Sequence, residues 1–210
     1  RLVEFHSKAN ALTDESMEIV AAAAADHGKG IIIHNDAQHF SAGVDLNAFR
    51  SLIEASDWDG IDAFLVRFQD AVCQLKYAPV PVVGAPSGLA AGGGYEVLTH
   101  CDKLVVHTNS VMGLVEAAVG VVPGGGGVKD TYFRWHAEKG NWDEAAWQTW
   151  MNIGYAATGS SPQLSARMQY FRTDYDETVM NRDRLLPRAI ALVTLLQDGY
   201  QAPEKPVATL

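Results

Sequence analysis

Short apolar segments alternate with helical patterns along the first half of the chain. Strands are predicted at Leu2–Phe5, Ile31–His34, Val80–Gly84 and Lys103–His107. Between the first two strands, a helix is predicted from about Asp14 through the alanines at 21–25. Thr13 is placed as its N-cap, with Ser16 three residues later. Short apolar strands separated by helices are typical of a sheet covered on both faces, so the predicted fold class is α/β.

Longer helical patterns and glycine clusters follow. Apolar residues at helical spacing fill the region from Phe49 to Tyr77, which predicts one long helix or two consecutive helices. Glycine clusters at 92–94 and 124–127 each precede a predicted helix, and the last predicted helix ends at Asp198-Gly199.

The predicted organisation is one domain. The polar loop of residues 35–47 is too long for a tight turn, and loops of that kind are often functional. No linker or repeat interrupts the pattern before about residue 155. We therefore expect a catalytic core at residues 1–155, followed by a C-terminal helical segment of the same domain at residues 156–210.

Composition and charge exclude several partner classes. The 210 residues carry 16 Lys+Arg against 25 Asp+Glu, a formal net charge of −9. Nucleic acids and anionic membrane surfaces favour basic proteins, so neither is expected as the main partner. No run of about 18 apolar residues and no cationic-then-apolar leader occurs, so we expect no membrane span, no export, and a location in the cytoplasm or the mitochondrial matrix. Two cysteines, Cys73 and Cys101, are too few for a disulfide framework or a zinc site.

The first glycine cluster is a candidate for chemistry. Adjacent glycines at a helix start let a ligand approach the backbone, and the first amides of the helix are unpaired donors for an oxygen that becomes negative. Glu96 lies in the first turn of that helix, and Glu116 follows after one intervening strand. Two carboxylates beside an amide-lined site can move a proton next to an activated carbonyl. On spacing alone, however, two solvated surface carboxylates remain the simpler interpretation.

Three motifs in a fixed order change that interpretation. They are Phe40-Ser41-Ala42-Gly43-Val44-Asp45-Leu46, Gly92-Gly93-Gly94-Tyr95-Glu96 with Cys101-Asp102, and Gly113-Leu114-Val115-Glu116 with Gly120-Val121-Val122-Pro123-Gly124. Across roughly residues 2–128, the chain resembles the crotonase family of enoyl-CoA hydratases and isomerases. The resemblance implies a crotonase-like spiral of ββα units, an acyl-CoA thioester substrate and an oxyanion hole made by two backbone N–H groups.

The resemblance also implies roles for individual residues. By position, the oxyanion amides are those of Val44 and Gly93. Glu96 and Glu116 match both glutamates of the hydratase pattern, with Glu116 as the principal proton-transferring group and Glu96 holding the water, although adjacent carboxylates titrate as a pair. The candidate substrate-binding residues are Ala42, Gly43, Asp45, Leu46, Gly92 and Gly124.

Further implications concern cofactors, assembly and the reaction. No metal and no bound cofactor are expected, because coenzyme A is part of the substrate, and a homotrimer or hexamer is implied. Family members that only isomerise generally have one carboxylate in the site. The presence of both Glu96 and Glu116 therefore favours an enoyl-CoA hydratase of fatty-acid β-oxidation or related acyl-CoA degradation. An isomerase, another crotonase reaction and a non-catalytic acyl-CoA-binding module stay open as alternatives.

Two departures from the family pattern affect the expected substrate pocket. Val115 stands where many relatives have proline, and residues 165–170 lack the usual glycine-containing pattern. The region 129–210 is more similar to the hydratase half of fused hydratase/3-hydroxyacyl-CoA dehydrogenase proteins than to stand-alone hydratases. The NAD-binding half of such a fusion is not expected within these residues, because no Gly-x-Gly-x-x-Gly follows a strand here.

Other motifs favour simpler interpretations. The cluster at 124–127 is not a phosphate loop, because Lys129 is not directly preceded by glycine and no Ser or Thr follows it; a turn that holds Glu116 is predicted instead. Ser87 lacks the flanking glycines of a nucleophile elbow. No metal-ligand spacing is found among His34, His39, His100 and His107.

Overall fold

A five-stranded parallel sheet lies at the centre of the protein. The computed structural model describes residues 1–206. The strands, in their order across the sheet, are β1 (Leu2–Val3), β2 (Ile31–His34), β3 (Val82–Ala85), β5 (Lys103–His107) and β8 (Glu177–Val179). All neighbouring strands pair in parallel. Both β2 and β3 are buried along their whole length, as their continuous apolar sequences predict.

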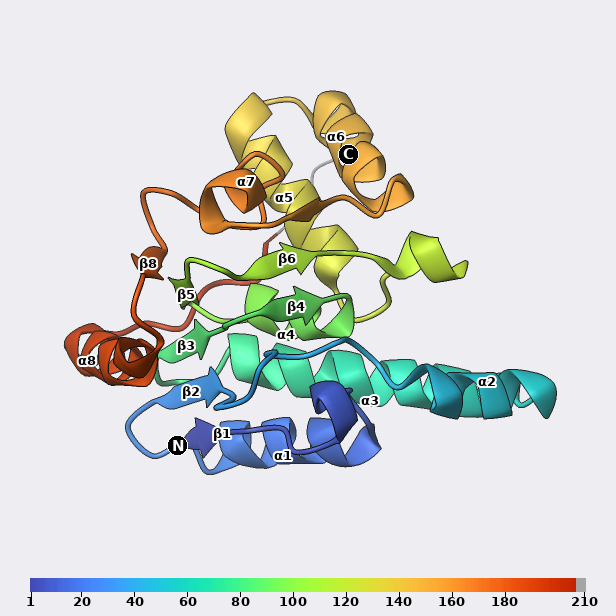
Figure 1. Cartoon of the computed structure of the whole chain (residues 1–210), viewed down its shortest axis with the longest axis horizontal. Helices are drawn as coiled ribbons and strands as arrows, with labels where there is room; N and C mark the ends of the chain where they lie inside the picture. Colours follow the sequence, from blue (N-terminus) through green and yellow to red (C-terminus); the bar gives the residue numbers. More distant parts are fainter. Residues whose placement is uncertain (207–210) are drawn as a thin grey trace.

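A smaller sheet is stacked beside the first (Figure 1). It contains β4 (Leu89–Ala91), β6 (Val111–Gly113) and β7 (Thr158–Gly159); β4 and β6 are parallel, and β7 is antiparallel to β6. The chain therefore alternates between two sheets and the helices that cover them. The predicted α/β class with a spiral of strand-strand-helix units is confirmed.

Helices cover both faces of the main sheet. The α-helices are α1 (Asp14–Ala25), α2 (Leu46–Glu54), α3 (Trp58–Lys76), α4 (Gly93–Thr99), α5 (Gly127–Lys139), α6 (Trp142–Gly154), α7 (Pro162–Ala166) and α8 (Leu185–Leu196). Short 3-10 helices are η1 (Lys8–Asn10), η2 (Glu116–Val119) and η3 (Arg182–Arg184).

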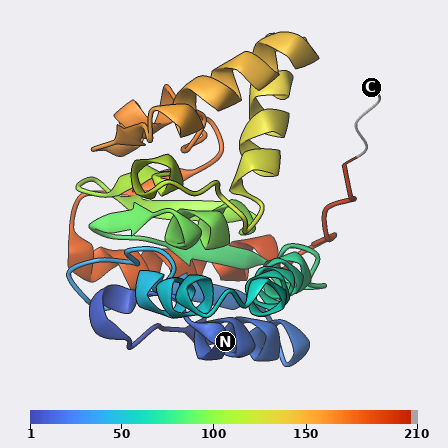
Figure 2. The same cartoon turned by 90° about the vertical axis from the view of Figure 1, so that its right-hand side faces the viewer.

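Helices α1 and α3 pack together on one side of the main sheet, whereas α8 packs on β2, β3 and β5. In Figure 2, α5 and α6 stand above the stacked sheets. No helix within residues 1–206 has the length and apolar character needed to cross a membrane.

The side chains on the two faces of the main sheet pack into two different hydrophobic clusters. Ile31 and Ile33 of β2 point into the larger cluster beneath α1, α3 and α4. Ile32, between them, points the other way, into a smaller cluster formed with Leu185 and Leu192 of α8. Because successive side chains of a strand face opposite sides, one apolar run supplies both clusters.

Local signals explain several helix boundaries. Thr13 and Ser16 form a capping box at the start of α1, which confirms the predicted N-cap. The region from Phe49 to Tyr77 forms two helices rather than one: α2 ends before Ser56, which has a φ of 55°, and the Asp57 side chain caps α3.

Two predicted strands have shifted ends. The first ends at Val3 instead of Phe5, because the Phe5 amide donates to Asn35 Oδ1 at 2.6 Å rather than to a strand. The third begins after Pro81, which has no N–H for a ladder hydrogen bond.

The C-terminal segment, predicted as helical, also contains two strands. It contributes β7 to the smaller sheet and β8 to the main sheet, and α8 packs on that sheet. An ion pair between the partly exposed Arg172 and the buried Asp176, with Nη2 and Oδ1 2.7 Å apart, lies just before β8. Asp176 Oδ1 also accepts from the Leu104 amide at 3.0 Å, which attaches this segment to β5. The boundary at residue 155 stays a prediction.

Candidate active site

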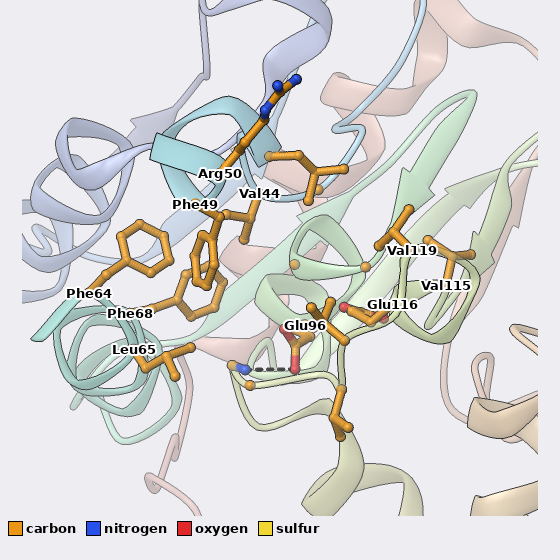
Figure 3. A pocket seen from close by; sticks show the side chains of 18 of the residues that line it. Val44, Phe49, Arg50, Phe64, Leu65, Phe68, Glu96, Val115, Glu116 and Val119 are labelled. Atoms are coloured by element: carbon orange, nitrogen blue, oxygen red, sulfur yellow. Dashed lines mark hydrogen bonds between the residues drawn. The ribbon is translucent and has the colours of Figure 1, made fainter. Parts of the chain in front are cut away.

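A cavity of about 800 Å3 opens between α2, α3 and the starts of α4 and α5. One wall is apolar and comes from the two helices of residues 46–76, with Phe49, Phe64, Leu65 and Phe68 (Figure 3). The opposite wall carries Glu96 and the segment around η2. A largely apolar cavity of this size with a few convergent polar groups is typical of a small-molecule site.

Parallel pairing brings the two carboxylates to this cavity. Strands β4 and β6 pair with Ala91 opposite Gly113, and the Gly92 amide donates to Gly113 O at 2.9 Å. The chain segments that leave these strands therefore run side by side. One of them turns into α4 and carries Glu96, whereas the other enters η2, which begins at Glu116. Both carboxylates consequently lie at the same end of the smaller sheet.

Glycine is required at the turn into α4. Gly92 has a φ of 53° and a ψ of −128°, a conformation that side chains disfavour. A Cβ at this position would also lie 3.0 Å from Glu116 Oε1. Glycine at 92 thus permits both the sharp turn and the close approach of Glu116.

The Glu96 carboxylate is held by backbone amides. Its side chain comes from α4 and is almost fully buried. Oε1 accepts from the Gly125 amide at 2.8 Å and from the Gly127 amide at 2.9 Å. Gly126, between them, has a φ of 105° and is the N-cap residue of α5, so the amides at this helix start point at the carboxylate.

The turn at 124–127 therefore holds a different carboxylate from the one predicted. The sequence prediction assigned it to Glu116, but its amides bind Glu96. That prediction is wrong because a helix start binds whichever anion the packing of helices places against it, and α5 packs on α4.

Burial dominates the electrostatics of both glutamates. It raises the pKa of Glu96 to about 8; the charge of Glu116 adds to the rise, and the Gly127 and Gly125 amides oppose it. Burial also raises the pKa of Glu116. Within residues 1–206, Glu116 Oε2 is buried without a hydrogen-bond partner. The cavity thus contains two carboxyl groups that retain protons at higher pH than exposed glutamates do.

The two predicted oxyanion amides lie close together. A Cβ on Gly93 would be 3.4 Å from the Val44 nitrogen, and one on Gly43 would be 3.6 Å from the Gly93 nitrogen. The Val44 segment is held by Leu12, which donates to Gly43 O at 2.8 Å and accepts from the Asp45 amide at 2.9 Å. Among the hydrogen bonds of residues 1–206, neither the Val44 nor the Gly93 amide is a donor. Both are free to bind a ligand oxygen.

Most predicted site residues line this one cavity. They are Ala42, Gly43, Val44, Leu46, Gly92, Gly93, Glu96, Glu116 and Gly124. Asp45 is the exception, because it lies outside the lining and its Oδ1 accepts from the Asn47 amide at 2.9 Å, which caps α2. The aromatic wall of this cavity was not predicted from the sequence. Helical spacing predicted that Phe64 and Phe68 would be buried, but it contains no signal that the buried face borders a cavity.

Within residues 1–206, His, Cys, Asp and Glu form no group of three or more that could hold a metal ion.

The stacked sheets, with an amide pair and two carboxylates at one cavity, define an α/β protein of the crotonase fold. A crystal structure of enoyl-CoA hydratase from Bacillus anthracis superposes with a TM-score of 0.75 at 18% identity, covering 93% of this chain and 72% of that one. Residues 3–135 match the family model described as enoyl-CoA hydratase/isomerase. The chain belongs to this family, and the predicted resemblance is confirmed.

Curated relatives extend the similarity beyond the family core. A probable 3-hydroxyacyl-CoA dehydrogenase from Bacillus subtilis is 32% identical over 209 residues, which are 97% of this chain and 26% of the relative. A fatty acid oxidation complex subunit alpha from Idiomarina loihiensis is 36% identical over 102 residues, or 49% of this chain and 14% of the relative. The chain thus spans about a quarter of the length of the first of these proteins.

Proposed function

We propose that this chain is an enoyl-CoA hydratase, which adds water across the double bond of a trans-2-enoyl-CoA to give a 3-hydroxyacyl-CoA. The observation that carries the proposal is the convergence of Glu96, Glu116 and the free amides of Val44 and Gly93 on one cavity. The names of the relatives support a place in fatty-acid β-oxidation or related acyl-CoA degradation.

The two amides act on the thioester carbonyl. As water adds at C3, negative charge develops on the thioester oxygen, and the Val44 and Gly93 N–H groups donate to it. These donors are held by the backbone before substrate binds, so they need little reorganisation in the transition state. Loss of one donor of this kind typically costs a factor of about 100 to 1000 in rate.

The two carboxyl groups bind the water molecule and transfer the protons. Glu96 Oε1 already accepts two amide hydrogens, so Oε2 is the oxygen that remains for a water molecule. Glu116 is proposed as the principal proton-transferring group. The oxygen of water bonds to C3, one water proton goes to a carboxylate, and C2 receives a proton from a carboxyl group. A pair with raised pKa values can supply one protonated and one ionised member near neutral pH.

The apolar wall suits the rest of the substrate. Phe64, Leu65 and Phe68 face the carboxylates across the cavity (Figure 3), where an acyl chain can be buried. The proposed reaction needs no resident metal or cofactor. The proposal keeps the predicted homotrimer or hexamer and the cytoplasmic or mitochondrial location.

Hydration can be followed by the loss of ultraviolet absorbance of the conjugated thioester. We expect turnover of crotonyl-CoA or a longer trans-2-enoyl-CoA, and a fall on the order of 100-fold or more in kcat for Glu96→Gln and Glu116→Gln. Glu138→Gln, which changes an exposed carboxylate outside the cavity, is the matched control. Tight binding without turnover would contradict hydration and favour a binding module. Conversion of 3-enoyl-CoA alone would favour an isomerase.

A further inference from the structure

A buried cluster of titratable side chains lies behind Glu96, outside the cavity lining. Asp130 Oδ1, in the first turn of α5, is 2.6 Å from Lys76 Nζ at the end of α3. Asp130 Oδ2 is 3.6 Å from Nε2 of His100, the C-cap residue of α4. The His100 and Asp130 side chains are 1% and 6% exposed. The cluster therefore joins the ends of three helices at a place that the substrate cavity does not reach.

His100 connects this cluster to the backbone of Glu96. Its Nδ1 lies 2.7 Å from the Glu96 carbonyl oxygen, which can only accept, so Nδ1 carries the proton. The ring orientation is thereby set, and Nε2 faces Asp130. Within residues 1–206, neither His100 Nε2 nor Asp130 Oδ2 has a hydrogen-bond partner, and the two atoms are 3.6 Å apart. Of the two side chains near Asp130, it is therefore Lys76 that forms the close ion pair.

The same turn of α5 that carries Asp130 also holds the Glu96 carboxylate. The Asp130 amide donates to Gly126 O at 3.1 Å, and the amides on either side of Gly126 bind Glu96 Oε1. Contact at this turn is close, because a Cβ on Gly126 would lie 2.8 Å from His100 Cε1. A shift of this turn would move the amide pair and the Glu96 carboxylate together.

We propose that Asp130 is a positioning residue for Glu96, which anchors the first turn of α5 to Lys76 and so fixes the amides that orient the carboxylate. The proposal deepens the proposed hydratase function and rests on it for its kinetic test. Asp130 does not line the cavity, so its effect on the reaction passes through Glu96.

The charge of Asp130 also affects the pKa of Glu96. The carboxylates that act on Glu96 are Glu116 and Asp130, and both raise its pKa. Positive charge on Lys76 and Lys129, together with His100, lowers the pKa of Asp130 despite its burial. Asp130 is therefore ionised at neutral pH. Removing its charge lowers the pKa of Glu96, an effect that a purely structural residue would not produce.

The test compares Asp130→Asn with Asp176→Asn. Asp176 is a buried, ion-paired carboxylate outside the cavity lining. The Asp176→Asn variant therefore measures what the loss of such an ion pair does when Glu96 is not involved. We expect Asp130→Asn to lower kcat by about 10- to 100-fold through misplacement of Glu96, with KM within about twofold, and to shift the pH profile of kcat to lower pH. Asp176→Asn should lower the melting temperature and leave kcat and the profile unchanged when assayed well below that temperature.

A readout independent of turnover separates this inference from the proposed function. In protein labelled with 13C at the glutamate carboxyl groups, the Glu96 resonance is assigned by its loss in Glu96→Gln. Its titration should move to lower pH in Asp130→Asn and stay in place in Asp176→Asn. If the unaltered chain hydrates no enoyl-CoA, the proposed function fails, and this titration decides the inference alone. An unmoved titration, or an Asp130→Asn variant with unchanged kcat and pH profile, overturns the positioning role.

Discussion

Replacing Glu96 by glutamine should make the protein more stable at neutral pH while it abolishes activity. Burial raises the pKa of Glu96 from 4.5 to about 8. Between these values the folded protein holds a proton that the unfolded chain has released. The stability of the folded state therefore falls as pH rises through this range, the reverse of the usual effect of a salt-bridged carboxylate.

The size of the effect follows from the shift. Each pKa unit corresponds to about 1.4 kcal/mol, so Glu96 should lower the free energy of unfolding by about 3 kcal/mol between pH 5 and pH 7.5. Glutamine is neutral throughout, and its oxygen can still accept from the Gly125 and Gly127 amides. The stability of Glu96→Gln relative to the unaltered protein should thus improve by about 3 kcal/mol over the same range.

Urea denaturation at the two pH values measures this difference. Both proteins should unfold with the same dependence on urea, so the midpoints report stability directly. Glu138→Gln removes an exposed carboxylate from α5 and should show little change in relative stability with pH. If Glu96→Gln differs from the unaltered protein by the same amount at pH 5 and pH 7.5, the carboxyl group is not buried in an uncharged form and the reasoning is refuted.

Three further predictions concern packing around the site and the sheet. Gly125→Ala should reduce kcat strongly, because a Cβ would lie 2.7 Å from Glu96 Oε2; normal hydration rates in this variant would show that the amide turn is not needed. Arg172→Met should lower the free energy of unfolding by about 3 to 5 kcal/mol, because it leaves the buried Asp176 carboxylate unpaired; unchanged urea midpoints would contradict this. Leu65→Trp should narrow the cavity and lower kcat/KM for decenoyl-CoA more than for crotonyl-CoA, whereas equal losses would place the acyl chain elsewhere.

Several features of the site could be predicted from sequence because they depend on local chemistry. The glycines at 92–94 indicated amides open to a ligand, and those of Val44 and Gly93 do lie together at the cavity. The motif order placed Glu96 and Glu116 in one site, and both line it. The residue that caps α1, Thr13, followed from N-cap preference, and the structure confirms the cap.

Other features required long-range packing. The aromatic residues of α3 have the spacing of an ordinary buried helix face, and the sequence does not show that part of this face borders an open cavity. The acceptor bound by the amides at 125–127 was misassigned for the same reason. Lys76, His100 and Asp130 are far apart along the chain, and only the packing of three helix ends brings them together.

The sequence by itself determined the α/β class, four strands of the main sheet, several helices and the motif residues, because these depend on periodicity, capping and glycine conformations over a few residues. The tertiary structure alone decided which amides hold Glu96, how far burial raises its pKa, and what lies behind it. The physical reason is that burial and electrostatic coupling depend on distances between segments remote in sequence, which local patterns do not specify.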